Sequence, residues 1–184
     1  MRLLKFLLPF LLLLFFTACN GGNQTTPNPN PTPTPNPTPN PVPTEKEKEI
    51  VLVFADKELM DNYKETRKIK YTKEEDLPKL ALEEWKKGPV NTKLQSIVPK
   101  DVTIQSIKKQ NNGAIVSFSS EIKNANLGST GEDFLLKQVA TILSQFDYKN
   151  TKFLIDEKEV ETILGHADAS RPTAPLDINK LKQM

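Results

Sequence analysis

The chain contains one histidine and one cysteine, and these two residues limit the chemistry that the sequence permits. His166 lies in the stretch Gly-His-Ala-Asp-Ala-Ser, so Asp168 and Ser170 could complete a Ser-His-Asp grouping. Residues this close in sequence rarely point at one another in the geometry of a catalytic triad. We therefore expect His166 to be a turn residue that makes a structural hydrogen bond.

A second candidate is the acidic cluster formed by Asp156, Glu157, Glu159 and Glu161. Paired carboxylates can hydrolyse glycans, but a solvated turn after a strand is the simpler interpretation. The sequence has no Gly-x-Ser-x-Gly elbow for a nucleophilic serine. One cysteine and one histidine also leave no spacing typical of metal ligands. We expect no catalytic residue, no cofactor and no metal ion.

The segment Gly128-Ser129-Thr130-Gly131-Glu132 could be read as a glycine-rich anion cradle at the start of a helix. It lacks the lysine of a P-loop, and its own carboxylates lie where an anion would sit. Ser129 and Glu132 have the spacing of a capping box. The prediction is therefore a structural helix cap with Ser129 as the N-cap residue.

The only cysteine, Cys19, follows a segment typical of a secretory signal. Arg2 and Lys5 precede an apolar stretch over residues 6–16, which is shorter than the roughly 20 residues of a transmembrane helix. Thr17-Ala18 stands directly before the cysteine. This arrangement resembles the bacterial lipobox. An ordinary signal peptide followed by a chance cysteine is the alternative.

The lipobox resemblance implies that a diacylglyceryl group is attached to Cys19, that residues 1–18 are removed and that the new N-terminus is acylated, for example with palmitate. Two or three acyl chains give stable membrane anchoring, whereas one binds only marginally. The expected location is the extracytoplasmic face of the cell membrane.

Residues 19–48 are predicted to form a spacer. Nine prolines between Pro27 and Pro43 alternate with Asn, Thr and Val. Such a segment has almost no apolar surface to bury, so we expect it to be disordered with polyproline II character. At roughly 3.1 Å per residue, the 25 residues from Asn20 to Thr44 reach on the order of 75 Å when extended. The segment lacks the basic residues of a proline-rich ligand and is better interpreted as a tether.

The remaining residues predict one folded domain over 49–176 and a short tail over 177–184. Strands are expected at residues 50–55, 67–72, 102–108, 114–119, 152–156 and 160–164. The first of these is apolar throughout, as in a strand buried on both faces. Asn112-Gly113 joins the third and fourth strands as a hairpin signal.

Two helices are expected between these strands. Asp76 offers an N-cap for the first helix, and Gly88-Pro89 supplies its stop signal. Trp85 follows Leu77 and Ala81 at helical spacing, which indicates a core role rather than a sugar-stacking one. Tyr63, in a polar segment, is the better candidate for an exposed contact. The second helix has one apolar face, made by Leu135, Val139, Ile142, Leu143 and Phe146.

The order of elements is strand, strand, helix, hairpin, helix, strand. This mixture without strict βα alternation favours an α+β fold, with a mainly antiparallel sheet and two helices packed on one face. About 140 residues outside the leader and the proline tract suffice for one well-buried core.

Several motifs together resemble the sporulation and spore germination family called GerMN. They occur in the family's order over residues 49 to 175: Phe54-Ala55-Asp56, Lys87-Gly88-Pro89, Gly113 to Ser119, Gly128 to Glu132, Phe153 to Asp156 and Gly165 to Pro172. The resemblance implies an extracytoplasmic domain, frequent on lipoproteins of sporulating and other Gram-positive bacteria. It also implies a fold similar to ring-building modules and a non-catalytic role in assembly or binding.

Charge narrows the choice of partners. The chain has 25 Lys and Arg against 23 Asp and Glu, and two of the basic residues lie in the leader. A neutral mature chain has no electrostatic attraction to nucleic acid. We expect a membrane contact through the lipid anchor, an envelope protein as partner and a monomeric isolated domain. A ligand-binding lipoprotein, for peptidoglycan or a small solute, is the alternative, and a wall hydrolase is a third.

Overall fold

The computed structural model describes residues 44–184. The predicted leader, Cys19 and the proline tract lie outside the described residues. None of the helices formed by the described residues has the length and apolar character needed to cross a membrane.

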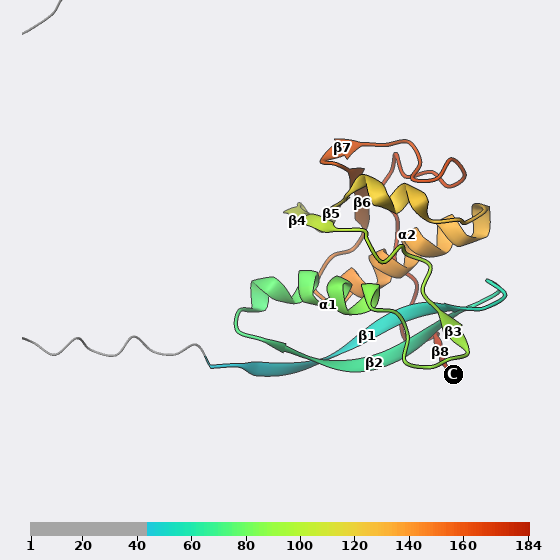
Figure 1. Ribbon diagram of the computed structural model, residues 1–184. Helices are drawn as coiled ribbons and strands as arrows, with labels where there is room; N and C mark the ends of the chain where they lie inside the picture. Colours follow the sequence, from blue (N-terminus) through green and yellow to red (C-terminus); the bar gives the residue numbers. More distant parts are fainter. Residues whose placement is uncertain (1–43) are drawn as a thin grey trace, which may run out of the picture. The chain divides into compact units, whose positions relative to one another are not determined.

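Eight strands and two α-helices make up this part of the chain (Figure 1). In order, the elements are β1 (Lys46–Asp56), β2 (Asn62–Tyr71), the 3-10 turn η1 (Glu74–Asp76), α1 (Leu77–Lys86), β3 (Leu94–Gln95), β4 (Ile104–Gln110), β5 (Gly113–Phe118), the 3-10 turn η2 (Ser120–Asn124), α2 (Ser129–Ser144), β6 (Thr151–Ile155), β7 (Lys158–Glu159) and β8 (Lys182–Gln183).

The strands form two four-stranded sheets, in the orders β3-β1-β2-β8 and β4-β5-β6-β7. Most neighbours are antiparallel, as in the long β1–β2 pair that runs from Lys46↔Tyr71 to Ala55↔Asn62. The pairs β5–β6 and β2–β8 are parallel. Parallel pairing of β5 and β6 is possible because the chain crosses between them through α2, which returns it to the same end of the sheet.

The two helices lie between the two sheets, and each helix contacts strands of both (Figure 1). The predicted α+β class is confirmed. The strands divide into two sheets because the helices are apolar over more than one narrow stripe. In α2 the residues Leu135, Leu136, Val139, Ile142 and Leu143 are all buried, so both sides of the helix need an apolar cover.

The core begins in β1. Ile50, Leu52, Val53, Phe54 and Ala55 are at most 1% exposed, as expected for a strand covered on both faces. The core role of Trp85 is also confirmed. Its indole Nε1–H donates to the carbonyl oxygen of Val53 at 3.0 Å and to Oε1 of Gln138 at 3.1 Å, so α1 is hydrogen-bonded to both β1 and α2.

The predicted hairpin is present as β4 and β5, with Asn111 at a φ of +52° in its two-residue loop. Gly113 itself is the first residue of β5. A Cβ there would lie 2.2 Å from Oδ1 and 3.2 Å from the backbone oxygen of Asn150. Glycine is therefore required at this position for the close approach of the segment that leads into β6.

Several local predictions are wrong in detail. Residues 160–164 form no strand, and the edge strand β7 is only Lys158–Glu159. Tyr63 lies half-buried in β2 opposite Phe54, not in an exposed loop. Asp76 is at the N-cap position of α1 without a side-chain capping bond, because η1 leads directly into the helix.

Strand pairing extends past the predicted domain limits at both ends. β1 starts at Lys46, inside the predicted spacer, because Lys46 to Glu49 pair with Lys68 to Tyr71. β8 lies inside the predicted tail, where Lys182 pairs with Tyr63 and Gln183 with Lys64.

Candidate functional site

The structure does not assemble a catalytic triad at His166. The His166 side chain is exposed and has no hydrogen-bond partner among residues 44–184. One carboxylate oxygen of Asp168 accepts the backbone N–H of Ser170 at 2.9 Å, and the other accepts Nε–H of Arg171 at 3.0 Å. The Ser170 hydroxyl and backbone bonds, with those of Arg171, lower the pKa of Asp168 to about 2. Asp168 is therefore ionised and occupied within its own turn.

Glu132 is the residue that organises this region, and its role differs from the predicted capping box. Its side chain is fully buried in the first turn of α2. Oε1 accepts the backbone N–H groups of Ile163 and Leu164, each at 2.8 Å. Oε2 accepts those of His166 and Ala167, at 2.8 and 3.1 Å. The carboxylate thus holds the loop that follows β7 against the start of α2.

Two opposing effects act on the Glu132 carboxyl. Burial raises its pKa, and the four backbone N–H donors lower it. The donors outweigh burial, so the pKa of Glu132 lies below its ordinary value and the buried group is charged.

The prediction that Ser129 caps α2 is wrong. Gly128 occupies the N-cap position, and Ser129 is the first helical residue, without a side-chain capping bond. The sequence pattern does mark the helix start. It does not reveal that the partners of Glu132 lie 31 to 35 residues away in sequence.

The acidic cluster after β6 forms a turn, as predicted. Asp156 and Glu157 are the two loop residues between β6 and β7, with φ of +49° and +61°. Oδ1 of Asp156 accepts from the Gln105 amide at 2.9 Å, and Glu157 accepts from Lys108 and Ser106 at 2.6 Å. The bonds from Lys108 and Ser106 lower the pKa of Glu157, and all three bonds attach the turn to β4.

Sequence reasoning missed a polar cluster around Arg67 in β2. Its guanidinium forms ion pairs with Glu65 at 2.5 Å and Glu84 at 2.9 Å, and its side chain is only 12% exposed. It also donates to the carbonyl oxygen of Gly88 at 2.6 Å. Glu65 accepts the backbone N–H of Val90 at 3.0 Å. Glu65 and Arg67 have opposite charges and lie two residues apart on one face of the strand. This spacing was the one sequence pattern that could have predicted their ion pair.

The Arg67 cluster ties the C-terminal end of α1 to β2. Burial raises the pKa of Glu65 and of Glu84, but their hydrogen bonds outweigh it and both pKa values are lowered. For Glu84 the largest of these bonds comes from Lys87, followed by Arg67. Both carboxylates are therefore charged and structural.

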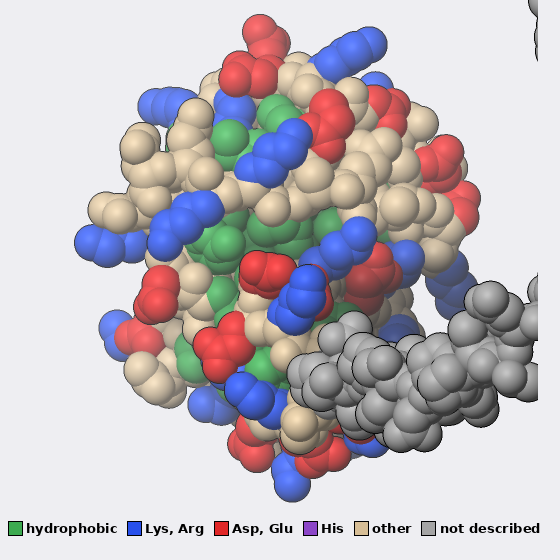
Figure 2. Space-filling model, turned by 90° about the vertical axis from the view of Figure 1, so that its left-hand side faces the viewer, with side chains coloured by type: hydrophobic (Ala, Val, Ile, Leu, Met, Phe, Trp, Pro, Cys, Tyr) green, Lys and Arg blue, Asp and Glu red, His purple; other side chains and the backbone are tan. Residues whose placement is uncertain are grey.

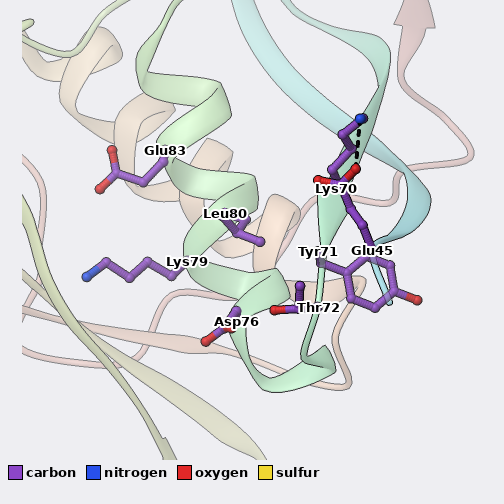
Figure 3. A pocket seen from close by; sticks show the side chains of 8 residues that line it. All are labelled: Glu45, Lys70, Tyr71, Thr72, Asp76, Lys79, Leu80 and Glu83. Carbon is purple, nitrogen blue, oxygen red and sulfur yellow. Dashed lines mark hydrogen bonds and ion pairs between the residues drawn. The ribbon is translucent and has the colours of Figure 1, made fainter. Parts of the chain in front are cut away.

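An open groove lies between the end of β2 and the first turns of α1. It has a volume of about 350 Å³ and is lined by Glu45, Lys70, Tyr71, Thr72, Asp76, Lys79, Leu80 and Glu83 (Figure 3). Leu80 projects from α1 toward β2, and on β2 Lys70 pairs with Glu45 at 2.8 Å (Figure 3). Tyr71 and Leu80 are partly buried. The groove offers a small apolar area within a charged rim.

The face at the left of Figure 1, where β1 begins and β2 ends, has a similar character on a larger scale. Apolar side chains gather in its middle, and Lys, Arg, Asp and Glu surround them (Figure 2). An apolar centre with a charged rim is typical of surfaces that contact other molecules.

The structure provides no test of the lipidation site, since Cys19 lies outside the described residues. Among residues 44–184, no group of three or more His, Cys, Asp or Glu side chains is placed to hold a metal ion.

The family comparison gives a match over residues 32–161 to the Germane family, which is described as "Sporulation and spore germination". The chain belongs to this family. The resemblance drawn from the motifs is therefore confirmed, and the domain is a GerMN domain. No curated protein matches the chain.

Solved structures agree with this membership. The first GerMN domain of the sporulation protein GerM from Bacillus subtilis is 25% identical, with a TM-score of 0.54, and the match covers 69% of this chain and 97% of that domain. A protein from Clostridium perfringens, provisionally named a lipoprotein, is 24% identical with a TM-score of 0.52, covering 75% and 93%. The tandem GerMN domains of GerM are 16% identical with a TM-score of 0.53, covering 80% and 50%.

Proposed function

We propose that this protein is a lipoprotein of the bacterial envelope whose GerMN domain acts by binding another envelope protein, without catalysing a reaction. The membership of the chain in the sporulation and spore germination family carries this proposal. The similarity to GerM, a sporulation protein, supports a role in sporulation or germination.

The use of the polar groups supports a non-catalytic role. A general acid or base works best when its pKa lies near the operating pH. Every carboxyl group of residues 44–184 with a shifted pKa is shifted downward, including Glu65, Glu132 and Asp168. These carboxylates hold loops and turns in place, and that use leaves them unsuited to proton transfer at neutral pH.

The leader supports membrane attachment. Cys19 follows an apolar segment and the small residues Thr17-Ala18, which is the arrangement of a lipidation signal. The similar protein from Clostridium perfringens carries a lipoprotein name. Acyl chains on Cys19 would keep the domain at the outer face of the membrane, on a proline-rich tether. This confinement raises its effective concentration toward membrane partners.

The test compares two sets of variants in cells. Metabolic labelling with a fatty-acid analogue should tag the wild type and not Cys19→Ser, and Cys19→Ser should lose both membrane association and function. His166→Ala, Asp168→Asn and Glu157→Gln should retain function when the protein stays folded. Equal labelling of wild type and Cys19→Ser would refute the anchor. Loss of function in a folded, membrane-bound His166 or Asp168 variant that still binds its partner would refute the non-catalytic role.

A further inference from the structure

The outer edge of β2 has a free stretch. β1 covers the inner edge of β2 along its whole length, whereas β8 pairs with the outer edge only at Tyr63 and Lys64. Among residues 44–184, no strand pairs with β2 beyond Lys64 on that side. Thr66, Lys68 and Lys70 are all exposed there.

The hydrogen-bond pattern shows which backbone groups point outward. The N–H and C=O of Val51 bond to the side chain of Gln145, so they point away from β2. Val51 is paired with Thr66. In an antiparallel pair, when the N–H and C=O of one residue point away from the partner strand, those of the residue opposite it point away as well. The N–H and C=O groups of Thr66, and by alternation those of Lys68 and Lys70, therefore point outward at the free edge.

The charged side chains of β2 from Thr66 to Lys70 are all basic. Lys70 is paired with Glu45 at 2.8 Å, so an acidic strand added at this edge would share Lys70 with Glu45. Lys68 and Lys70 lie on the same face of the sheet as Thr66, and they form the outermost row. The next row inward, on β1, is acidic, with Glu49 opposite Lys68 and Glu47 opposite Lys70. A strand added outside the lysine row would therefore be favoured if its adjacent side chains were acidic, since opposite charges across neighbouring strands attract.

The free edge also leads into the groove, because Lys70 and Tyr71 line both. Side chains of an added strand alternate between the two faces of the sheet. Residues next to the lysines would face solvent, and those next to Tyr71 would lie at the apolar wall that Leu80 helps to form. The edge and the groove together favour a partner strand that has acidic residues at alternate positions and an apolar residue at one end.

We propose that the edge of β2 from Thr66 to Lys70 binds an extended acidic segment of a partner protein as an additional strand. The proposal rests on the association role given above and names its surface. β8 shows that the same edge accepts a strand at Tyr63 and Lys64. Lysines on an edge strand discourage pairing with copies of the same edge, which leaves an acidic strand as the favoured occupant.

The binding experiment uses the chain from residue 19 with Cys19→Ser, so that the tether is present and lipid is absent. The probes are two labelled ten-residue peptides that alternate Thr with Glu or Thr with Lys and end in Leu. The Glu peptide should bind and slow the hydrogen exchange of the Thr66, Lys68 and Lys70 amides. The Lys peptide should bind at least tenfold more weakly.

Variants separate charge from backbone pairing. Lys68→Glu combined with Lys70→Glu should weaken the Glu peptide at least tenfold and strengthen the Lys peptide, whereas Lys123→Glu, an exposed change outside this edge, should alter neither. Thr66→Pro removes an outward N–H without removing a bond to β1. It should abolish binding while the melting temperature stays close to that of the parent chain. Absence of Glu-peptide binding, or Glu-peptide binding that survives either Lys68→Glu with Lys70→Glu or Thr66→Pro, would overturn the proposal.

A crosslinking experiment tests the natural partner. A photoreactive residue at position 66 in cells should trap an envelope protein through a segment with acidic residues at alternate positions, and one at position 123 should not. Trapping of a second copy of this chain, of a non-acidic segment, or of nothing would overturn the edge proposal. The proposed function would still stand if Cys19→Ser abolished function in the same cells while Thr66→Pro had no effect.

Discussion

Gln145 bonds to Val51 as a neighbouring strand would. Its Oε1 accepts the backbone N–H of Val51 at 2.8 Å, and its Nε2–H donates to the carbonyl oxygen of the same residue at 2.7 Å. One side-chain amide at the end of α2 thereby satisfies both outward-facing backbone groups of Val51. The helix layer closes the edge of β1 at this point, whereas the outer edge of β2 beyond Lys64 stays open.

Replacing Gln145 by Met should lower the free energy of unfolding by about 1–3 kcal/mol, because both backbone groups of half-buried Val51 lose their partner. Lys149→Met, at an exposed position in the following loop, is the matched control and should change it by less than about 0.5 kcal/mol. Urea unfolding at pH 7 measures both. Equal stability of the two variants would mean that water replaces the amide without loss.

Glu132→Gln should lower the free energy of unfolding by about 2–4 kcal/mol. The amide keeps the shape of the side chain, but its NH₂ group faces two backbone N–H groups that then have no acceptor. The loop from Ile163 to Ala167 should also exchange its amide hydrogens faster. Asp133→Asn, on the next residue of α2, removes only a surface ion pair with Lys137 and should cost less than about 1 kcal/mol. Unchanged protection of the loop in Glu132→Gln would contradict the role assigned to the carboxylate.

The stability contributed by Glu132 should depend on pH. Its folded-state pKa lies below the ordinary value of 4.5, so the folded state favours the ionised carboxyl. This contribution is complete above pH 4.5 and is lost as the pH falls through the lowered pKa of the folded state. The difference in unfolding free energy between wild type and Glu132→Gln should therefore be smaller at pH 3 than at pH 7. Glu65 and Glu84 titrate alike in both proteins, so the difference isolates Glu132. A constant difference would show that the pKa of Glu132 is the same in the folded and unfolded states.

The start of α2 offers a stabilising substitution. Gly128 is the N-cap residue, with a φ of −83° that any residue adopts, and a Cβ there would meet no atom within 4 Å. Gly128→Asp should raise the free energy of unfolding by about 0.5–1 kcal/mol, through a capping bond and a less flexible unfolded chain. Ser129→Ala should leave stability nearly unchanged, since Ser129 caps nothing. A larger loss in Ser129→Ala than about 0.5 kcal/mol would restore the capping-box interpretation.

Local patterns were sufficient for the main elements. The apolar run at Ile50 to Ala55 predicted a doubly covered strand, and the spacing of Leu135, Val139 and Leu143 predicted the buried face of α2. Both predictions hold because burial of such runs depends on residues a few positions apart. The family motifs follow the same short-range logic, and they were sufficient to identify the GerMN domain.

The candidate site depended on contacts that no local pattern contains. The sequence by itself determined that Glu132 starts a helix and that a strand runs through residues 67–71. Only the tertiary structure decided that Glu132 accepts four N–H groups from a loop more than 30 residues away. Likewise, only the packing of α2 against β1 and the short reach of β8 decided which strand edge stays open. A buried carboxylate and an unpaired edge are defined by their surroundings, and those surroundings come from distant parts of the chain.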